Sequence, residues 1–105
     1  MRRWIAAAMF AVVAACSGPR ATATATKLRP SARAGYYRVD TRLVNTGGRG
    51  QVELTVRLRN KATARIVTQT QSVDLERRDH TDVTLEIPAP PADYEVEARV
   101  DYPPQ

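Results

Sequence analysis

The feature that most constrains the fold of this chain is a strict alternation of apolar and polar residues. In residues 50–60 every second residue from Val52 to Leu58 is apolar, and residues 94–102 repeat the pattern. A period of two is typical of a β-strand with one buried face and one solvated face. No segment beyond residue 36 shows the 3.6-residue period of a helix. The chain is therefore expected to fold as an all-β domain.

Three further strands are expected. The same alternation marks residues 37–43 and 82–87, while residues 64–75 show a weaker pattern. Polar groups fall on both faces of this weaker segment, which is typical of an edge strand or of a strand with a bend. The residues concerned are Thr68, Gln69, Thr70, Gln71 and Ser72. With glycine-rich and proline-rich turns between them, about five antiparallel strands indicate a small sandwich or a small barrel.

The first fifteen residues have the organisation of a secretory signal peptide. Arg2 and Arg3 form a basic start, and an apolar run of twelve residues extends from Trp4 to Ala15. A membrane-spanning helix needs roughly 20 apolar residues, so this run is too short to cross a bilayer. We interpret residues 1–15 as a leader that is removed and takes no part in the fold.

The end of this leader, Val-Ala-Ala-Cys at residues 13–16, resembles the lipobox of bacterial lipoproteins. The resemblance implies cleavage before Cys16, a lipid on its sulfur and attachment to the cell envelope. Because Ser17 rather than an aspartate follows Cys16, the resemblance favours the periplasmic face of the outer membrane in an organism with two membranes. The alternative is an ordinary signal peptide that leaves Cys16 as an unpaired thiol.

Positive charge is unevenly distributed along the chain, whose formal net charge is +5. Residues 17–35 carry four basic and no acidic residues, whereas residues 36–105 carry ten basic and eleven acidic residues. No nucleic-acid partner is expected, because such a partner requires positive charge on the folded unit. Residues 16–35 contain one large aliphatic residue and are predicted to be a disordered basic tether before the domain. Its charges would suit an anionic membrane surface or would only keep the linker solvated.

Residues 37–102 resemble a known class of envelope domain. A strand ends in Val44-Asn45-Thr46-Gly47, a glycine-containing loop follows, and the alternating segments 52–58 and 83–87 come later. This order is similar to that of immunoglobulin-like domains of the FxLYD and CARDB type, which occur in many bacterial and archaeal surface lipoproteins. The resemblance implies a small immunoglobulin-like β-sandwich over residues 36–105.

Few groups of residues in the sequence could form a catalytic, metal-binding or anion-binding site. His80 is the only histidine, so the chain alone cannot assemble a histidine-based metal site or a Ser-His-acid relay. The acidic residues of the last strand could attract calcium, but cross-strand pairing with Arg57 and Arg59 is the favoured interpretation. The glycines of residues 47–50 could form an anion nest, although a hairpin turn accounts for them. No cofactor, metal, small-molecule ligand or enzymatic activity is expected.

The sequence therefore predicts a lipid-anchored envelope protein with a non-enzymatic interaction or assembly module. The predicted partner surface is the edge segment 68–72, which would pair with a second copy or with a strand of another envelope protein. A solvated edge without a partner is the alternative for this segment. A periplasmic carrier or chaperone-like protein is the alternative function, and it would require an apolar cavity or groove.

Overall fold

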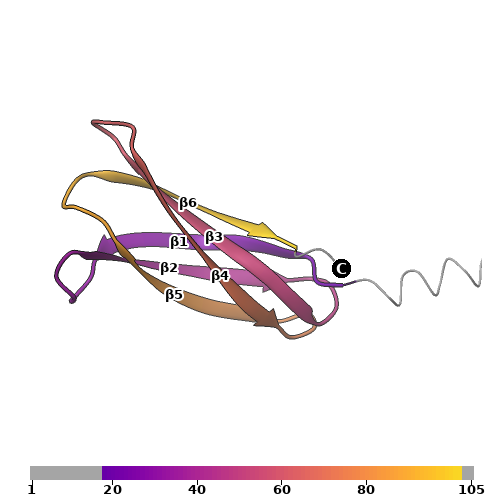
Figure 1. The fold of residues 1–105 in the computed structure, drawn as a ribbon. Coiled ribbons are helices and arrows are strands. Elements are labelled where there is room, and N and C mark those ends of the chain that lie inside the picture. The colour runs from indigo at the N-terminus through magenta and orange to yellow at the C-terminus, as the bar shows by residue number, and fades with distance from the viewer. Residues whose placement is uncertain (1–17, 103–105) are drawn as a thin grey trace, which may run out of the picture.

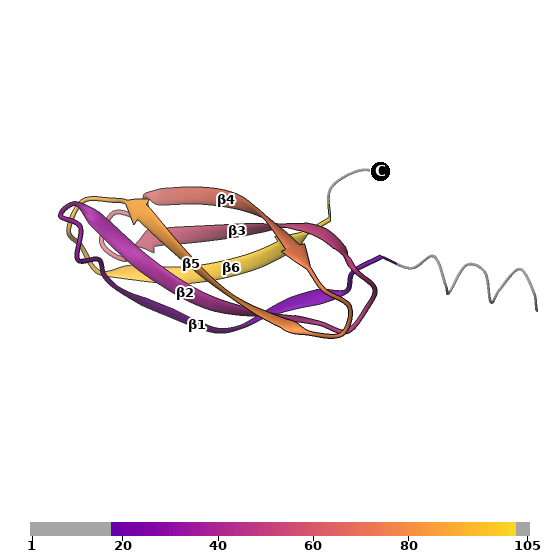
Figure 2. The ribbon, with the colours of Figure 1, turned by 90° about the horizontal axis from the view of Figure 1, so that it is seen from below.

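The computed structural model describes residues 18–102, which form six strands in two packed sheets (Figures 1 and 2). The strands are β1 (Ala21–Pro30), β2 (Tyr36–Asn45), β3 (Gly50–Asn60), β4 (Ile66–Leu75), β5 (His80–Pro88) and β6 (Tyr94–Asp101). Sheet A has the order β1-β2-β5 and sheet B the order β4-β3-β6, with every neighbouring pair antiparallel. The prediction of an all-β antiparallel sandwich is confirmed. The described residues contain no helix long and apolar enough to cross a membrane.

The strand order matches that of immunoglobulin-like sandwiches. Strands β1, β2 and β5 take the positions A, B and E, while β4, β3 and β6 take C′, C and F. The hydroxyl of Tyr94, at the start of β6, donates a hydrogen bond of 2.6 Å to the carbonyl of Pro90. This contact has the geometry of the tyrosine corner found at the same connection in such sandwiches. Residues 18–102 include no strand in position G beside β6, so β6 is an edge.

The core lies between the two sheets and is built from alternate residues of each strand. Its largest fully buried side chains are Leu43, Leu54, Leu58, Leu75, Ile87, Val39, Val52 and Val56. Each aliphatic side chain buried in this way contributes roughly 1.5–3 kcal/mol relative to exposure. The alternation in residues 50–60 and 82–87 is confirmed, because the apolar residues of β3 and β5 are buried between less buried polar neighbours.

The prediction of a disordered tether over residues 16–35 is wrong for Ala21–Pro30, which form β1 along the edge of β2. Ala21 and Ala23 pack against the core with Leu28. Backbone pairing and the burial of small side chains stabilise this strand without many large aliphatic residues, and threonine favours extended backbone. The sandwich therefore begins before residue 36 and has six strands. The predicted signal peptide and Cys16 lie outside the described residues.

A β-bulge interrupts β1 between Thr24 and Lys27. Ala25 has a positive φ of 50° there, so β1 places one extra residue against β2. Thr41 of β2 is 3% exposed and satisfies the polar groups of the bulge. Its hydroxyl donates to the Thr24 carbonyl at 3.3 Å and lies 2.8 Å from the hydroxyl of Thr26. A polar residue is accommodated inside the sandwich because the bulge supplies its hydrogen-bond partners.

Candidate functional site

The five residues predicted as a partner-binding edge, Thr68 to Ser72, lie together on β4, which is an edge strand of sheet B. The prediction that this segment is an edge strand is confirmed. All five side chains are exposed or only half-buried. An edge strand directs alternate backbone N–H and C=O groups away from its neighbour, where another strand can pair with them.

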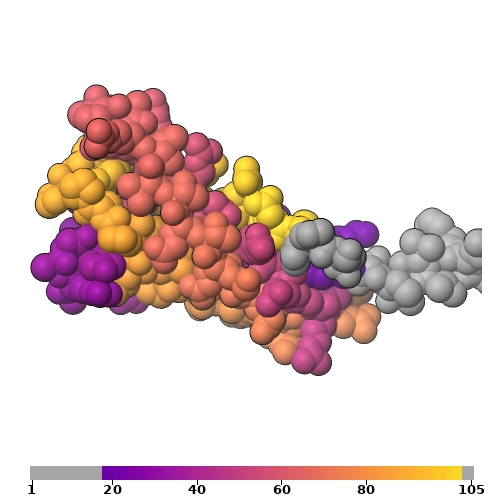
Figure 3. Space-filling model, viewed as in Figure 1, coloured from indigo at the N-terminus to yellow at the C-terminus, as the bar shows by residue number. Residues whose placement is uncertain are grey.

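The inner face of β4 is only partly covered. The register with β3 places Val67, Gln69 and Gln71 on the core face, opposite Leu58, Val56 and Leu54 respectively. The three β3 residues are fully buried, whereas Gln71 is exposed and Gln69 and Val67 are half-buried. The β3–β4 hairpin projects beyond sheet A, so sheet A does not cover this part of β4 (Figures 1 and 3). This overhang explains why polar residues occupy both faces of the strand.

The four edge strands of the sandwich differ in how they resist pairing. Edge strands are normally protected by charges, prolines or bulges. Strand β1 has its bulge and Lys27, β5 has charged residues and ends in a proline, and β6 carries a charged residue at every second position. Residues 66–73 of β4, in contrast, contain no charge, no proline and no bulge. Strand β4 is therefore the edge best suited to accept another strand.

The outer face of sheet B carries the acidic residues that could have attracted calcium. Arg57 lies 3.9 Å from Glu97 and Arg59 lies 3.6 Å from Glu95, each pair joining β3 to β6. The predicted cross-strand pairing is therefore confirmed. Within residues 18–102 no cluster of three or more His, Cys, Asp or Glu side chains is arranged to hold a metal ion.

The outer face of sheet A is centred on Asp40, a residue that the sequence did not single out. Its carboxylate accepts a hydrogen bond of 2.6 Å from the hydroxyl of Thr84 and lies 2.9 Å from Arg29 and 3.1 Å from Arg38. The Thr84 hydroxyl, aided by the two arginines, lowers the pKa of Asp40. This cluster links all three strands of the sheet and leaves the carboxylate fully engaged, which favours a structural role.

Asn45 joins the segments at the end of the sandwich where the described chain begins. Its side chain is 2% exposed and accepts hydrogen bonds from the N–H groups of Arg20 and Gly47, at 2.9 and 3.0 Å. Its amide nitrogen donates to the carbonyls of Gly48 and Glu76, at 2.9 and 2.8 Å. The resemblance pointed to Asn45 only as part of a turn. The structure shows that its side chain connects three segments that are distant in sequence.

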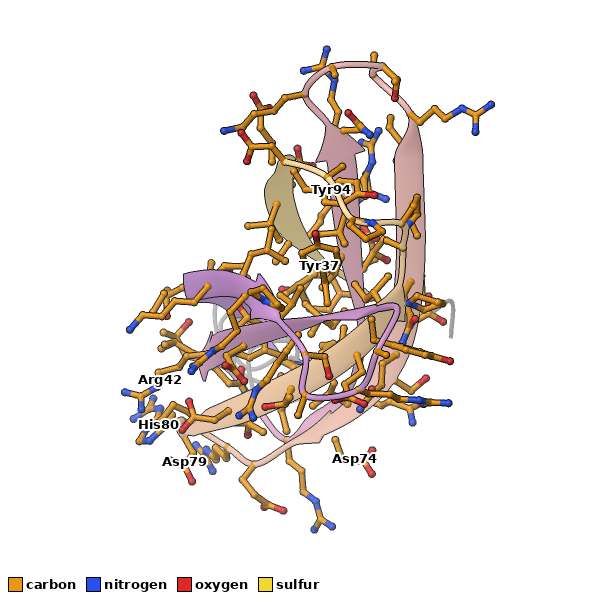
Figure 4. All side chains as sticks on the ribbon, turned by 90° about the vertical axis from the view of Figure 1, so that its left-hand side faces the viewer. Tyr37, Arg42, Asp74, Asp79, His80 and Tyr94 are labelled. Atoms are coloured by element: carbon orange, nitrogen blue, oxygen red, sulfur yellow. The ribbon has the colours of Figure 1, made fainter. Side chains whose placement is uncertain are left out.

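A surface hollow of about 530 Å³ lies beside this junction, and its lining includes Arg42, Asp79 and His80 (Figure 4). Arg42 forms an ion pair of 2.8 Å with Asp82, and each partner shifts the pKa of the other toward its charged form. His80 lies at the start of β5, with its Nδ1 3.7 Å from the carboxylate of Asp79. That distance is too long for a hydrogen bond, so the pair does not form the oriented base that nucleophilic catalysis requires.

Comparison with known proteins adds no functional assignment. No protein-family model matches the chain, and no curated protein matches it.

Proposed function

We propose that the protein is a lipid-anchored component of the cell envelope whose β-sandwich is a non-enzymatic interaction module of the FxLYD and CARDB type. In this proposal a partner strand adds to the open edge of β4. The observation that carries it is the contrast among the four edges, of which β4 alone has a long uncharged stretch without a bulge or proline. Strand addition obtains affinity from main-chain hydrogen bonds, which such an edge can supply.

The packing of the sandwich favours an interaction module over a carrier. A carrier needs an apolar cavity of several hundred cubic ångströms, whereas the space between these sheets is filled by buried aliphatic side chains. The hollow beside His80 lies at the surface and is lined partly by charged residues. A filled core with an open strand edge supports recognition of a protein segment rather than of an enclosed ligand.

The anchor in this proposal is Cys16, which lies outside the described residues. Its support is the sequence Val-Ala-Ala-Cys after a short apolar run. Mass spectrometry of the mature N-terminus, purified from membranes of the native host, provides the test. We expect a chain that begins at Cys16 and carries a diacylglyceryl group, and no lipid on a Cys16→Ala variant. A wild-type chain with a free thiol would contradict the anchor.

The edge is tested by placing a charge on it. Gln71 faces the core side of β4 but is exposed, so Gln71→Lys adds an inward-pointing charge without disturbing packed side chains. Gln51→Lys is the matched control, because Gln51 is exposed on the outer face of the central strand β3. We expect affinity capture from solubilised membranes to recover a partner with wild type and with Gln51→Lys but not with Gln71→Lys. Equal recovery by all three proteins would contradict strand addition at β4.

A further inference from the structure

Three segments meet at the end of the sandwich where the described chain begins, and we call this end the anchor-side end. They are residues 18–20, the β2–β3 loop at 46–49 and the β4–β5 turn at 76–79 (Figure 1). Backbone hydrogen bonds join them, from Gly48 N–H to the Gly18 carbonyl at 3.1 Å and from Arg78 N–H to the Gly47 carbonyl at 3.2 Å. A Cβ on Gly47 would lie 2.6 Å from the Gly18 oxygen, so only glycine permits this contact. The anchor-side end is therefore an ordered surface.

Four exposed arginines project from the anchor-side end: Arg20, Arg49, Arg77 and Arg78. Among residues 18–102 none of the four forms an ion pair, although seven ion pairs between arginine or lysine and a carboxylate occur elsewhere. Two carboxylates lie within these segments, those of Glu76 and Asp79, and that of Asp74 lies at the adjoining end of β4. The side chain of Asp79 already accepts a hydrogen bond of 2.8 Å from the N–H of His80. Four guanidinium groups are thus left available to an external anion.

The short distance between Cys16 and the sandwich determines what these arginines face. Only Ser17 lies between Cys16 and Gly18, and two residues of extended chain span at most about 7 Å. A disordered tether of some twenty residues would have allowed the domain to rotate freely, but half of that segment is β1, which begins at Ala21. If Cys16 carries the lipid, the anchor-side end must lie at the surface of the membrane.

We propose that the anchor-side end binds the phosphate groups of anionic phospholipids and holds the sandwich upright on the membrane. This inference rests on the lipid anchor of the proposed function. Guanidinium groups match phosphate oxygens in geometry and form charge-assisted hydrogen bonds with them. Each basic residue near an anionic surface raises the partition coefficient about fivefold.

The opposite end of the sandwich carries cations too, but distance separates them from the membrane. Strands of about ten residues place that end roughly 30 Å away, which is several times the Debye length of about 8 Å in physiological salt. The cations there are also partly engaged, because Lys61 lies 3.7 Å from Asp93 and Arg33 stacks 3.9 Å above the ring of Tyr36. Only the anchor-side arginines are placed to contact headgroups.

The test supplies the anchor chemically, so that it does not depend on lipidation in the cell. A chain of residues 16–105 contains all six strands and the single cysteine, Cys16. That thiol is coupled to a maleimide lipid in vesicles of phosphatidylcholine, with or without phosphatidylglycerol. Trypsin cleavage after Arg77 and Arg78 is then compared with cleavage after Lys61 and Arg65, which lie in the distal β3–β4 turn of the same molecule.

At low ionic strength we expect phosphatidylglycerol to slow cleavage after Arg77 and Arg78 at least tenfold relative to the distal sites. Raising the salt concentration should reverse this protection. A variant with Arg20→Gln and Arg49→Gln keeps the reporter sites and should lose most of the protection, because two arginines at about fivefold each account for a factor of up to about 25. The control with Lys27→Gln and Arg33→Gln removes the same charge elsewhere and should retain it.

Two results would overturn the inference. One is equal protection on vesicles with and without phosphatidylglycerol, which would mean that the end lies near the membrane without binding its headgroups. The other is equal loss of protection in both double variants, which would mean that only net charge matters. An unmodified Cys16 in protein from cells would instead contradict the lipid anchor, so failure of the anchor and failure of headgroup binding are distinguishable.

Discussion

Asn45→Ala tests whether one buried amide holds the anchor-side end together. The substitution removes both acceptor bonds, from Arg20 and Gly47, and both donor bonds, to Gly48 and Glu76. A buried polar group left without a partner costs about 1–3 kcal/mol. Because these loops are close to solvent, water will reach some of the four groups, and we expect a total loss of about 3–5 kcal/mol.

That loss is large for a domain of this size. About 85 ordered residues at roughly 0.05–0.15 kcal/mol each give a free energy of unfolding of about 4–13 kcal/mol. Urea unfolding followed by circular dichroism should show a midpoint lower by about 2 M for a slope near 2 kcal/mol/M. Amide hydrogen exchange at Arg20 and Gly47 should also accelerate more than exchange in the centre of β3, because the loops lose their link first.

Thr46→Ala is the matched control for Asn45→Ala. Thr46 is the next residue along the chain, it is exposed, and its hydroxyl makes one contact of 3.3 Å with the Arg20 carbonyl. Its loss should change the free energy of unfolding by about 0.5 kcal/mol or less. If Asn45→Ala costs under about 1 kcal/mol, or no more than Thr46→Ala, then the amide network does not stabilise the fold and the reasoning is refuted.

Two further predictions concern the sandwich itself. Tyr94→Phe should lower the free energy of unfolding by about 1–2 kcal/mol in urea titrations, because it leaves the Pro90 carbonyl unpaired, while Tyr36→Phe should have little effect. Acidification should weaken the fold through Asp40, whose lowered pKa makes its ionised form stabilising above the ordinary value of 3.8. That contribution is lost as pH falls through the lowered pKa. Urea midpoints between pH 6 and pH 2 should therefore fall less steeply for Thr84→Ala, and identical slopes would contradict the assignment.

The sequence predicted the strands that are buried on one face. Alternation identified β2, β3, β5 and β6 because sheet pairing across the core exposes every second residue of each. Alternation did not identify β1, because its inward residues Ala21, Ala23, Thr26 and Leu28 include only one large aliphatic side chain and the bulge at Ala25 breaks the period of two. Composition alone suggested disorder there, whereas pairing with the free edge of β2 decides the conformation.

The candidate site was predictable only in part. Polar residues on both faces of 68–72 indicated an edge strand. The strand order was needed to show which other strands are edges and that they, unlike residues 66–73 of β4, carry charges, a proline or a bulge that oppose pairing. The role of Asn45 could not be predicted from local sequence patterns, because its partners Arg20 and Glu76 lie 25 and 31 residues away in sequence. The same topology brings the arginines of three separate segments to one end.

The anchor and the edge together restrict which partner can bind. Strand β4 runs from Ile66, at the distal end, to Leu75, beside the anchor-side turn. Two copies that pair their β4 strands antiparallel would have their anchored ends on opposite sides of the dimer, separated by roughly 30 Å for strands of ten residues. Copies that stand upright in one leaflet cannot form such a dimer. Because β4 runs toward the membrane, a partner strand that pairs with it antiparallel must run away from the membrane.

This restriction leads to a last prediction about oligomeric state. In solution, any dimer that residues 16–105 form through β4 should be captured by chemical cross-linking and abolished by Gln71→Lys. The same chain coupled through Cys16 to a single vesicle surface should give no such dimer, even though the surface raises its local concentration. A cross-linked dimer that persists on the vesicle and disappears with Gln71→Lys would show that the domain lies flat, and the upright orientation would have to be abandoned.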